Sequence, residues 1–223
     1  MIKYIKKLIT FFYHLFTQKI SSEKLIFSLK IDIDKIKYFL ELKNTLDRRD
    51  FIWDGNWDQK KIDILSYRNY SDSYNSIFQI YNEKIDYEQC DEYKKKAKLL
   101  LEGKKTARAH NIDELKNYFK SLDNLKDNLK KFGYKSQLEL ENNTRVNDEI
   151  GVVIDRDGKI IKLEDKFGGT HRFALCKVLK IKTIIVSVKA IHKSLLNEID
   201  LKEVTTSKNK FITKTLLVKK IKY

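Results

Sequence analysis

The chain of 223 residues contains no proline, seven glycines and two cysteines. Without proline it has no proline-rich linker, polyproline II ligand or cis-proline turn. Cys90 and Cys176 are too few for a disulfide framework or a four-cysteine zinc site. We expect both to be small buried thiols, and we expect a reducing, cytoplasmic compartment.

The sequence also lacks the run of roughly 20 apolar residues that a membrane-spanning helix needs. Near the N-terminus, the apolar stretch Leu8–Phe16 follows three lysines. This order imitates a signal peptide, but no small-residue cleavage site follows, so we reject that interpretation. Residues 1–20 predict a basic amphipathic helix. Two interpretations stay open, packing on its own domain and peripheral contact with a membrane.

Acidic residues are in the minority, because 46 Lys and Arg residues outnumber 31 Asp and Glu residues and give a formal net charge of +15. Such a charge favours phosphate-bearing partners: nucleic acid, nucleotides or an anionic membrane surface. AT-rich codon usage, which raises the lysine count, is the alternative explanation. The hydrophobic share of 42% is enough for a buried core and excludes wholesale disorder.

The first part of the chain predicts one strand followed mainly by helices. Residues 25–33 alternate in polarity and predict a strand, after which Asp34 predicts the cap of a short helix reaching Leu40. Residues 73–131 repeat apolar side chains at helical spacing, and Gly133 predicts the end of the last helix.

After Gly133 the pattern changes to short β-branched segments. Residues 151–154 and 159–163 predict strands, joined by an Asp-Gly hairpin turn. A helix from about His171 to Leu179 and a buried strand over 183–188 follow. The order predicts an α+β fold with a mixed sheet.

The segment most indicative of chemistry is Gly168-Gly169-Thr170-His171-Arg172, at the predicted start of a helix. Free amides and the positive dipole end of a helix bind anions, and two glycines allow a close approach. Thr170 can cap the helix or donate to phosphate, His171 can relay a proton, and Arg172 can bind phosphate oxygens with two donors. A plain structural turn is the alternative.

The motif Phe167-Gly-Gly-Thr-His-Arg172 resembles the ParB/sulfiredoxin superfamily, in which sulfiredoxins have Phe-Gly-Gly-Cys-His-Arg before a helix. The preceding helix, Gly133 and the turn ending at Gln137 fit the same order, over residues 113–190. The resemblance implies an α+β fold: a ParB/sulfiredoxin-like mixed sheet with flanking helices, preceded by a mainly helical N-terminal region.

The same resemblance implies an organisation along the chain. Residues 1–20 form the basic helix, and residues 21–112 form a family-specific region with a helical insert. The ParB/sulfiredoxin-like core then spans 113–192, and 193–223 form a basic C-terminal extension.

Members of this superfamily bind nucleotide phosphates at this turn: sulfiredoxins and a free-serine kinase use ATP, and ParB proteins bind CTP and DNA. The resemblance therefore implies that Gly168 to Arg172 hold the phosphates of ATP or another nucleotide with Mg²⁺. Thr170 replaces the sulfiredoxin cysteine, which argues against sulfinate repair. Gly168 replaces an aspartate found in related motifs, so the catalytic acid comes from elsewhere. Asp148, Glu149 and Asp165 are nearby in the sequence. Of these we select Glu149 and Asp165 as catalytic candidates, together with His171.

A second resemblance involves Gly55-Asn56-Trp57-Asp58. It is similar to the Gly-Asp-Trp-Asp motif of ParB-like proteins often encoded among surface-polysaccharide genes. Aromatic and carboxylate groups suit sugar binding, so Trp57 and Asp58 are candidate substrate-binding residues; plain packing and helix capping are the alternatives.

Three functions follow as expectations. The first is a phosphotransferase acting on a small hydroxyl or glycan-related acceptor. The second is a ParB-like nucleic-acid-binding protein, and the third a nucleotide-binding module without catalysis.

Overall fold

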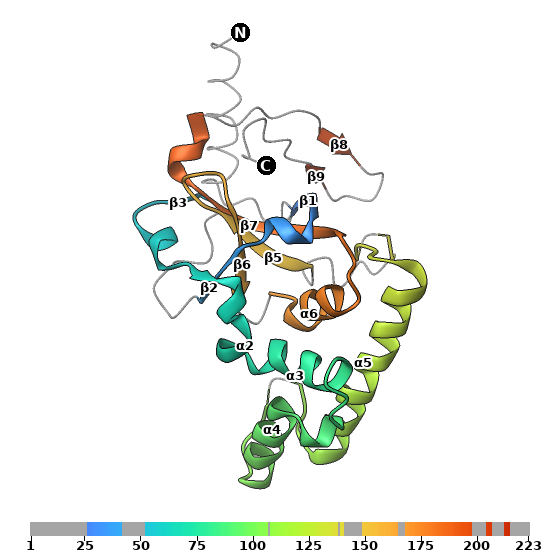
Figure 1. Cartoon of the computed structure of the whole chain (residues 1–223). Helices are drawn as coiled ribbons and strands as arrows, with labels where there is room; N and C mark the ends of the chain where they lie inside the picture. Colours follow the sequence, from blue (N-terminus) through green and yellow to red (C-terminus); the bar gives the residue numbers. More distant parts are fainter. Residues whose placement is uncertain are drawn as a thin grey trace.

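The computed structural model describes residues 26–41, 52–106, 108–137, 139–140, 149–164, 168–197, 204–206 and 212–214. These form a mixed β-sheet with the main helices gathered on one face (Figure 1). The predicted α+β class with a mixed sheet is confirmed. None of the described helices combines the length and the apolar character needed to cross a membrane. The predicted N-terminal helix over residues 1–20 lies outside the described residues.

The described strands form one sheet in the order β4-β2-β6-β5-β7-β1-β9-β8, and β3 pairs with β7. The β2–β6 and β5–β7 pairs are parallel, whereas β5–β6 and β1–β7 are antiparallel. Thus strands from the N-terminal region lie on both sides of the β5–β6 hairpin. The strands are β1 (Ile26–Asp32), β2 (Tyr38–Glu41), β3 (Ile52–Trp53), β4 (Ile62–Asp63), β5 (Ile150–Ile154), β6 (Ile160–Glu164), β7 (Thr183–His192), β8 (Val204–Thr206) and β9 (Ile212–Lys214).

The helix expected from Asp34 to Leu40 is wrong. A single 3-10 turn, η1 (Ile33–Lys35), is capped by Asp32, and the chain then enters β2. Ile36 and Phe39 are both buried, which satisfies the helical spacing of their sequence. The segment that buries them is extended and not helical, because the β2 backbone forms its hydrogen bonds with β6.

The helices expected within residues 73–131 are confirmed as three separate helices. The longest, α5, ends at Gly133, whose φ of 71° and amide bond to Leu129 mark the predicted glycine cap. The described helices are α2 (Tyr67–Tyr70), α3 (Asp72–Tyr81), α4 (Asp91–Leu101), α5 (Ile112–Phe132) and α6 (Thr170–Val178). Further 3-10 turns are η2 (Trp57–Lys60), η3 (Ile64–Ser66), η4 (Tyr87–Gln89) and η5 (Lys193–Asn197).

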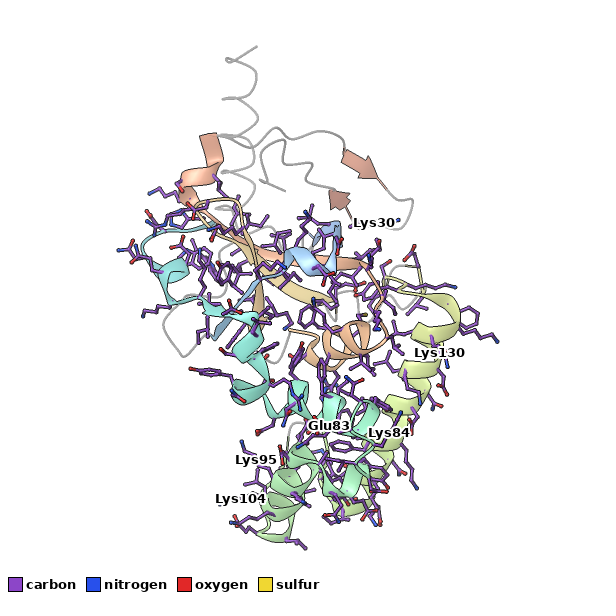
Figure 2. The ribbon with its side chains drawn as sticks, in the orientation of Figure 1. Lys30, Glu83, Lys84, Lys95, Lys104 and Lys130 are labelled. Atoms are coloured by element: carbon purple, nitrogen blue, oxygen red, sulfur yellow. The ribbon has the colours of Figure 1, made fainter. Side chains whose placement is uncertain are left out.

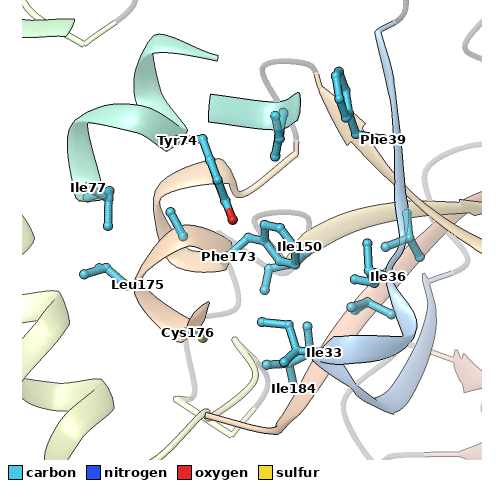
Figure 3. Packing of buried hydrophobic residues seen from close by; sticks show 14 of the residues in the cluster. Ile33, Ile36, Phe39, Tyr74, Ile77, Ile150, Phe173, Leu175, Cys176 and Ile184 are labelled. Carbon is cyan, nitrogen blue, oxygen red and sulfur yellow. The ribbon is translucent and has the colours of Figure 1, made fainter. Parts of the chain in front are cut away.

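The main core lies between the sheet and the helices, with α6 in the middle. Figure 3 shows Phe173 and Leu175 of α6 between the sheet residue Ile150 and the α3 residues Tyr74 and Ile77. Burial of one such side chain stabilises the fold by about 1.5–3 kcal/mol. The start of α6 is therefore fixed by packing on two sides, and this places the Gly168–Arg172 turn.

A smaller core lies on the opposite face of the sheet. Trp53 and Trp57 pack there on Val153, Ile161 and Ala190. The strand neighbours Val152 and Ile160 belong to the main core, and successive strand residues point to opposite faces. The sheet thus separates the two tryptophans from α6.

The N-terminus of α5 gives a test of local stability. The Asn111 side chain accepts a hydrogen bond from the Glu114 amide at 2.8 Å, and Glu114 in turn accepts from the His110 amide. We expect Asn111→Ala to lower the free energy of unfolding by about 1 kcal/mol in urea denaturation. Asn117→Ala, on the exposed face of the same helix, should be neutral or slightly stabilising, and equal losses for both variants would contradict the cap.

Candidate functional site

The Gly168–Gly169 corner is pressed against the first residues of β5. Gly169 has a left-handed φ of 60°, and an added Cβ would lie 3.1 Å from the Ile150 Cα. The Gly168 carbonyl accepts from the Gly151 amide at 3.3 Å. The near neighbour of Gly169 is therefore the backbone of the protein itself, and this contact explains why glycine is needed there.

Thr170 binds a carboxylate. The N-cap residue of α6 is Gly169, which has no side chain to cap the helix, and the Thr170 hydroxyl donates to Glu164 Oε2 at 3.1 Å. Glu164 also accepts from Ser71 Oγ at 2.7 Å and from the Tyr67 hydroxyl. The last residue of β6 is thereby tied to α2 and α3 at the start of α6.

His171 is held at both ring nitrogens. Its Nε2 lies 2.7 Å from Glu92 Oε2, and its Nδ1 lies 3.0 Å from the Tyr118 hydroxyl. An ionised carboxylate only accepts hydrogen bonds, so Nε2 donates to Glu92, and in the neutral ring Nδ1 accepts from Tyr118. Residues from α4, α5 and α6 thus fix the orientation of this imidazole.

Glu92 is 2% exposed, yet it is held as a carboxylate. Burial by itself would raise its pKa, but His171 and Lys96 outweigh burial and lower the pKa to about 2. Lys96 Nζ lies 2.6 Å from Oε1, and Ser73 donates to the same oxygen at 2.8 Å. Glu92 therefore stays charged at neutral pH.

Arg172 forms the third pair, with Glu149 at the start of β5. Arg172 Nη1 lies 3.4 Å from Glu149 Oε2, which also accepts from the Tyr134 hydroxyl. With its carbonyl oxygen turned toward Arg172, Gln137 accepts from Nη2 at 2.6 Å. Glu149 is 2% exposed, and burial, opposed by Tyr134, the Gln137 amide and Arg172, raises its pKa. The Arg172–Glu149 pair therefore favours the charged carboxylate less than the His171–Glu92 pair does.

A buried lysine from β6 lies next to the turn. Lys162 in β6 has 0% exposure and lies between the rings of Tyr67 and Phe173, at 5.9 and 6.0 Å from their centroids. Its ammonium donates to the Leu163 carbonyl and lies 3.5 Å from Thr170 Oγ1. Each of the three polar side chains of this turn therefore contacts a carboxylate: Thr170 contacts Glu164, His171 contacts Glu92, and Arg172 contacts Glu149.

The structure brings Glu149 together with the predicted residues 168–172, whereas Asp165 and Asp148 lie outside the described residues. Trp57 and Asp58 are elsewhere. Trp57 packs in the smaller core on the other face of the sheet. Asp58 is 2% exposed and accepts from Nε and Nη2 of Arg156, at 2.8 and 2.7 Å. In this arrangement the two sets do not form one site.

Sequence reasoning missed most partners of the turn. Glu92, Tyr118 and Tyr134 come from helices or loops distant in sequence, and no local pattern indicates them. Lys162 and Glu164 gave a weak signal, since Lys162 interrupts an apolar strand. Within the described part of the chain, no three His, Cys, Asp or Glu side chains form a ready set of metal ligands.

The Gly169 corner can be tested by stability. We expect Gly169→Ala to lower the free energy of unfolding by about 3 kcal/mol, since it combines left-handed strain with a backbone clash. Gly103→Ala is the matched control, because Gly103 has a φ of 73° but nothing within 4 Å of an added Cβ. It should lose only about 1–2 kcal/mol. Equal losses in urea denaturation would argue against the close contact with Ile150.

The His171–Glu92 pair predicts a pH dependence. The folded-state pKa of Glu92 is lowered from 4.5 to about 2, so the unfolded state binds more protons in this window. The pair's stabilisation is complete above pH 4.5 and is lost as the pH falls toward 2. We expect Glu92→Gln to flatten the loss of stability over this range, by on the order of 3 kcal/mol.

The control for this prediction is Glu102→Gln, which removes an exposed carboxylate. Chemical denaturation at pH 5, 4, 3 and 2.5 gives the slopes. An unchanged slope for Glu92→Gln, or an equal change for Glu102→Gln, would show that Glu92 does not titrate as the geometry requires.

Comparison of the chain with protein-family models, with curated proteins and with solved structures finds no significant match.

Proposed function

We propose that the chain is a nucleotide-binding protein of ParB/sulfiredoxin-like type that transfers a phosphoryl group to a small hydroxyl or glycan-related acceptor. The observation that supports this most is the Arg172–Glu149 pair at the first turn of α6. It places a guanidinium, suited to phosphate oxygens, next to a buried carboxylate with a raised pKa. Carboxylates with shifted pKa values often occur at catalytic sites, and a raised pKa suits a group that accepts a proton near neutral pH.

In this proposal the nucleotide phosphates take the place of Glu149 at Arg172. The Nη1–Oε2 separation of 3.4 Å is long for a charged pair, and the exchange leaves Arg172 with a charged partner. The displaced Glu149 accepts the proton of the acceptor hydroxyl. The acceptor oxygen forms a bond to the terminal phosphorus, and the bond from phosphorus to the leaving nucleoside diphosphate breaks.

The other two pairs position the turn. His171 bonds to Glu92 of α4 and Tyr118 of α5, and these bonds hold the first turn of α6 in place relative to those two helices. Thr170 and Glu164 do the same against α2 and α3. Precise placement of the phosphate-binding group matters in phosphoryl transfer, because most of the catalysis comes from positioning and charge stabilisation.

The resemblance also implies Mg²⁺. In phosphotransferases Mg²⁺ is commonly held by one or two carboxylates together with the substrate phosphates. Of the carboxylates at this turn, Glu164, which accepts from the hydroxyls of Tyr67, Ser71 and Thr170, would hold the ion. When bound, Mg²⁺ would neutralise charge on the transferred phosphoryl group.

Nucleic-acid binding of ParB type is the second candidate. Exposed lysines occur on several elements; Figure 2 labels Lys84, Lys95 and Lys104 on the helical side and Lys130 on α5. A polyanion bound by such a surface would lose affinity steeply with salt, whereas a nucleotide at Arg172 depends on one side chain.

The test measures the stability of the folded chain to heat and to denaturant, with and without ATP and Mg²⁺. We expect about 2.7 kcal/mol of stabilisation at a nucleotide concentration of about 100 Kd, and its loss in Arg172→Ala. Arg68→Ala, which removes an exposed arginine paired with Glu83, should keep the full effect. A wild-type chain that ATP does not stabilise, or an Arg172→Ala variant that it stabilises equally, would refute the proposal.

Catalysis is measured separately, with radiolabelled ATP and a panel of sugars, amino acids and polyols. Glu149→Gln should retain nucleotide binding and lose transfer. Binding without transfer to any acceptor would favour the non-catalytic module, and tight, salt-sensitive DNA binding without an ATP effect would favour the second candidate.

A further inference from the structure

A cavity of about 570 Å³ lies beside the crossover from β1 to β2, and its lining includes no residue of α6. Its walls come from β1, the crossover, the start of β6 and the start of β7. We infer that this cavity binds a small phosphate ester with a planar or apolar group, of which a mononucleotide is the representative. This site is separate from the one proposed for phosphoryl transfer.

The lining of the cavity is strongly basic. Lys30, Lys35, Lys37 and Lys159 line it together with one carboxylate, Asp32, so its formal net charge is +3. Three of the lysines belong to β1 and the crossover, and Lys159 comes from the hairpin before β6. Figure 2 shows Lys30 beside β1. The fold thus gathers positive charge from distant segments around one cavity, which attracts an anion.

Asp32 is the one carboxylate in the lining, and two further carboxylates pair with lysines outside it. Asp32 Oδ1 accepts from the Asp34 amide at 2.9 Å, and Asp34 pairs with Lys177 at 2.7 Å. Asp155, which is fully buried, pairs with Lys61. At the first turn of α6 three glutamates offset the cations, whereas the lining of this cavity has four ammonium groups and one carboxylate.

Lys159 already has an acidic partner. Lys159 Nζ lies 3.5 Å from Asp157 Oδ2, and both side chains are exposed. Exposed pairs of this kind contribute little, because water screens them. A phosphate can therefore replace Asp157 as the partner of Lys159.

The lining of the cavity also includes the aromatic ring of Tyr38, which packs against the smaller core. The Tyr38 ring has Lys159 Nζ at 5.9 Å and Lys61 Nζ at 5.3 Å from its centroid. An aromatic ring beside ammonium groups suits a ligand that stacks its planar part and places its phosphate on the lysines. A volume of this size is usual for one small molecule, which favours a mononucleotide over a polymer.

The experiment is calorimetric titration of the full chain with AMP, with inorganic phosphate and adenosine as separate arms. We expect AMP to bind more tightly than either fragment. Lys37→Ala/Lys159→Ala should weaken AMP binding tenfold or more. Lys120→Ala/Lys130→Ala, which removes the same charge from exposed positions of α5, should change it less than twofold.

Arg172→Ala separates this inference from the proposed function. AMP affinity that falls in Arg172→Ala but not in Lys37→Ala/Lys159→Ala would overturn the inference and leave the α6 site standing. Equal weakening by both lysine pairs, or a single-stranded oligonucleotide that binds more tightly than AMP with a steep salt dependence, would overturn it in favour of a nucleic-acid surface. Absence of AMP binding to the wild-type chain at millimolar concentration would also overturn it.

Discussion

The contact between the Gly169 backbone and the backbone of Ile150 fixes where α6 begins. Because no side chain fits between them, the first turn of α6 lies directly on the start of β5. This brings Arg172 to Glu149, one residue before Ile150, and leaves Thr170 and His171 to face the helices on either side. A larger residue at position 169 would move all three side chains together. The geometry of the polar contacts therefore depends on the close packing of two backbone segments.

The electrostatics of the turn follow from burial. A helix start, a guanidinium and a fully buried ammonium concentrate positive charge in a poorly solvated place, which is unfavourable unless carboxylates are near. Glu92, Glu149 and Glu164 provide them. The balance differs between sites: Glu92 is firmly charged, whereas the pKa of Glu149 is raised. A turn with unequal pairs can keep its shape through one pair while another exchanges partners with a ligand.

Local signals in the sequence predicted local structure well. The Asp-Gly hairpin, the helix ending at Gly133 and the helix after the diglycine are all present, because each depends on residues within a few positions. The prediction failed at β2, where apolar spacing could not distinguish a helix from an extended crossover whose strand pairs with β6, more than 100 residues away. The same limit applies to the site. Gly168 to Arg172 could be selected as a motif, but Glu92 and Tyr118 reach His171 only through the packing of α4 and α5 on α6.

Strand β6 contributes residues to both the basic cavity and the first turn of α6, and it also keeps the two apart. Ile160, at its start, lines the basic cavity, whereas Lys162 and Glu164 point to the first turn of α6. At about 3.3 Å per residue, Ile160 and Glu164 are about 13 Å apart along the strand. A phosphate held by Lys37 and Lys159 is therefore too far along the strand to contact Glu164 directly. The cavity attracts anions through the net positive charge of its lining, whereas the cations of the turn are already offset by carboxylates. These are different physical tasks, and the sheet places them at opposite ends of one rigid element.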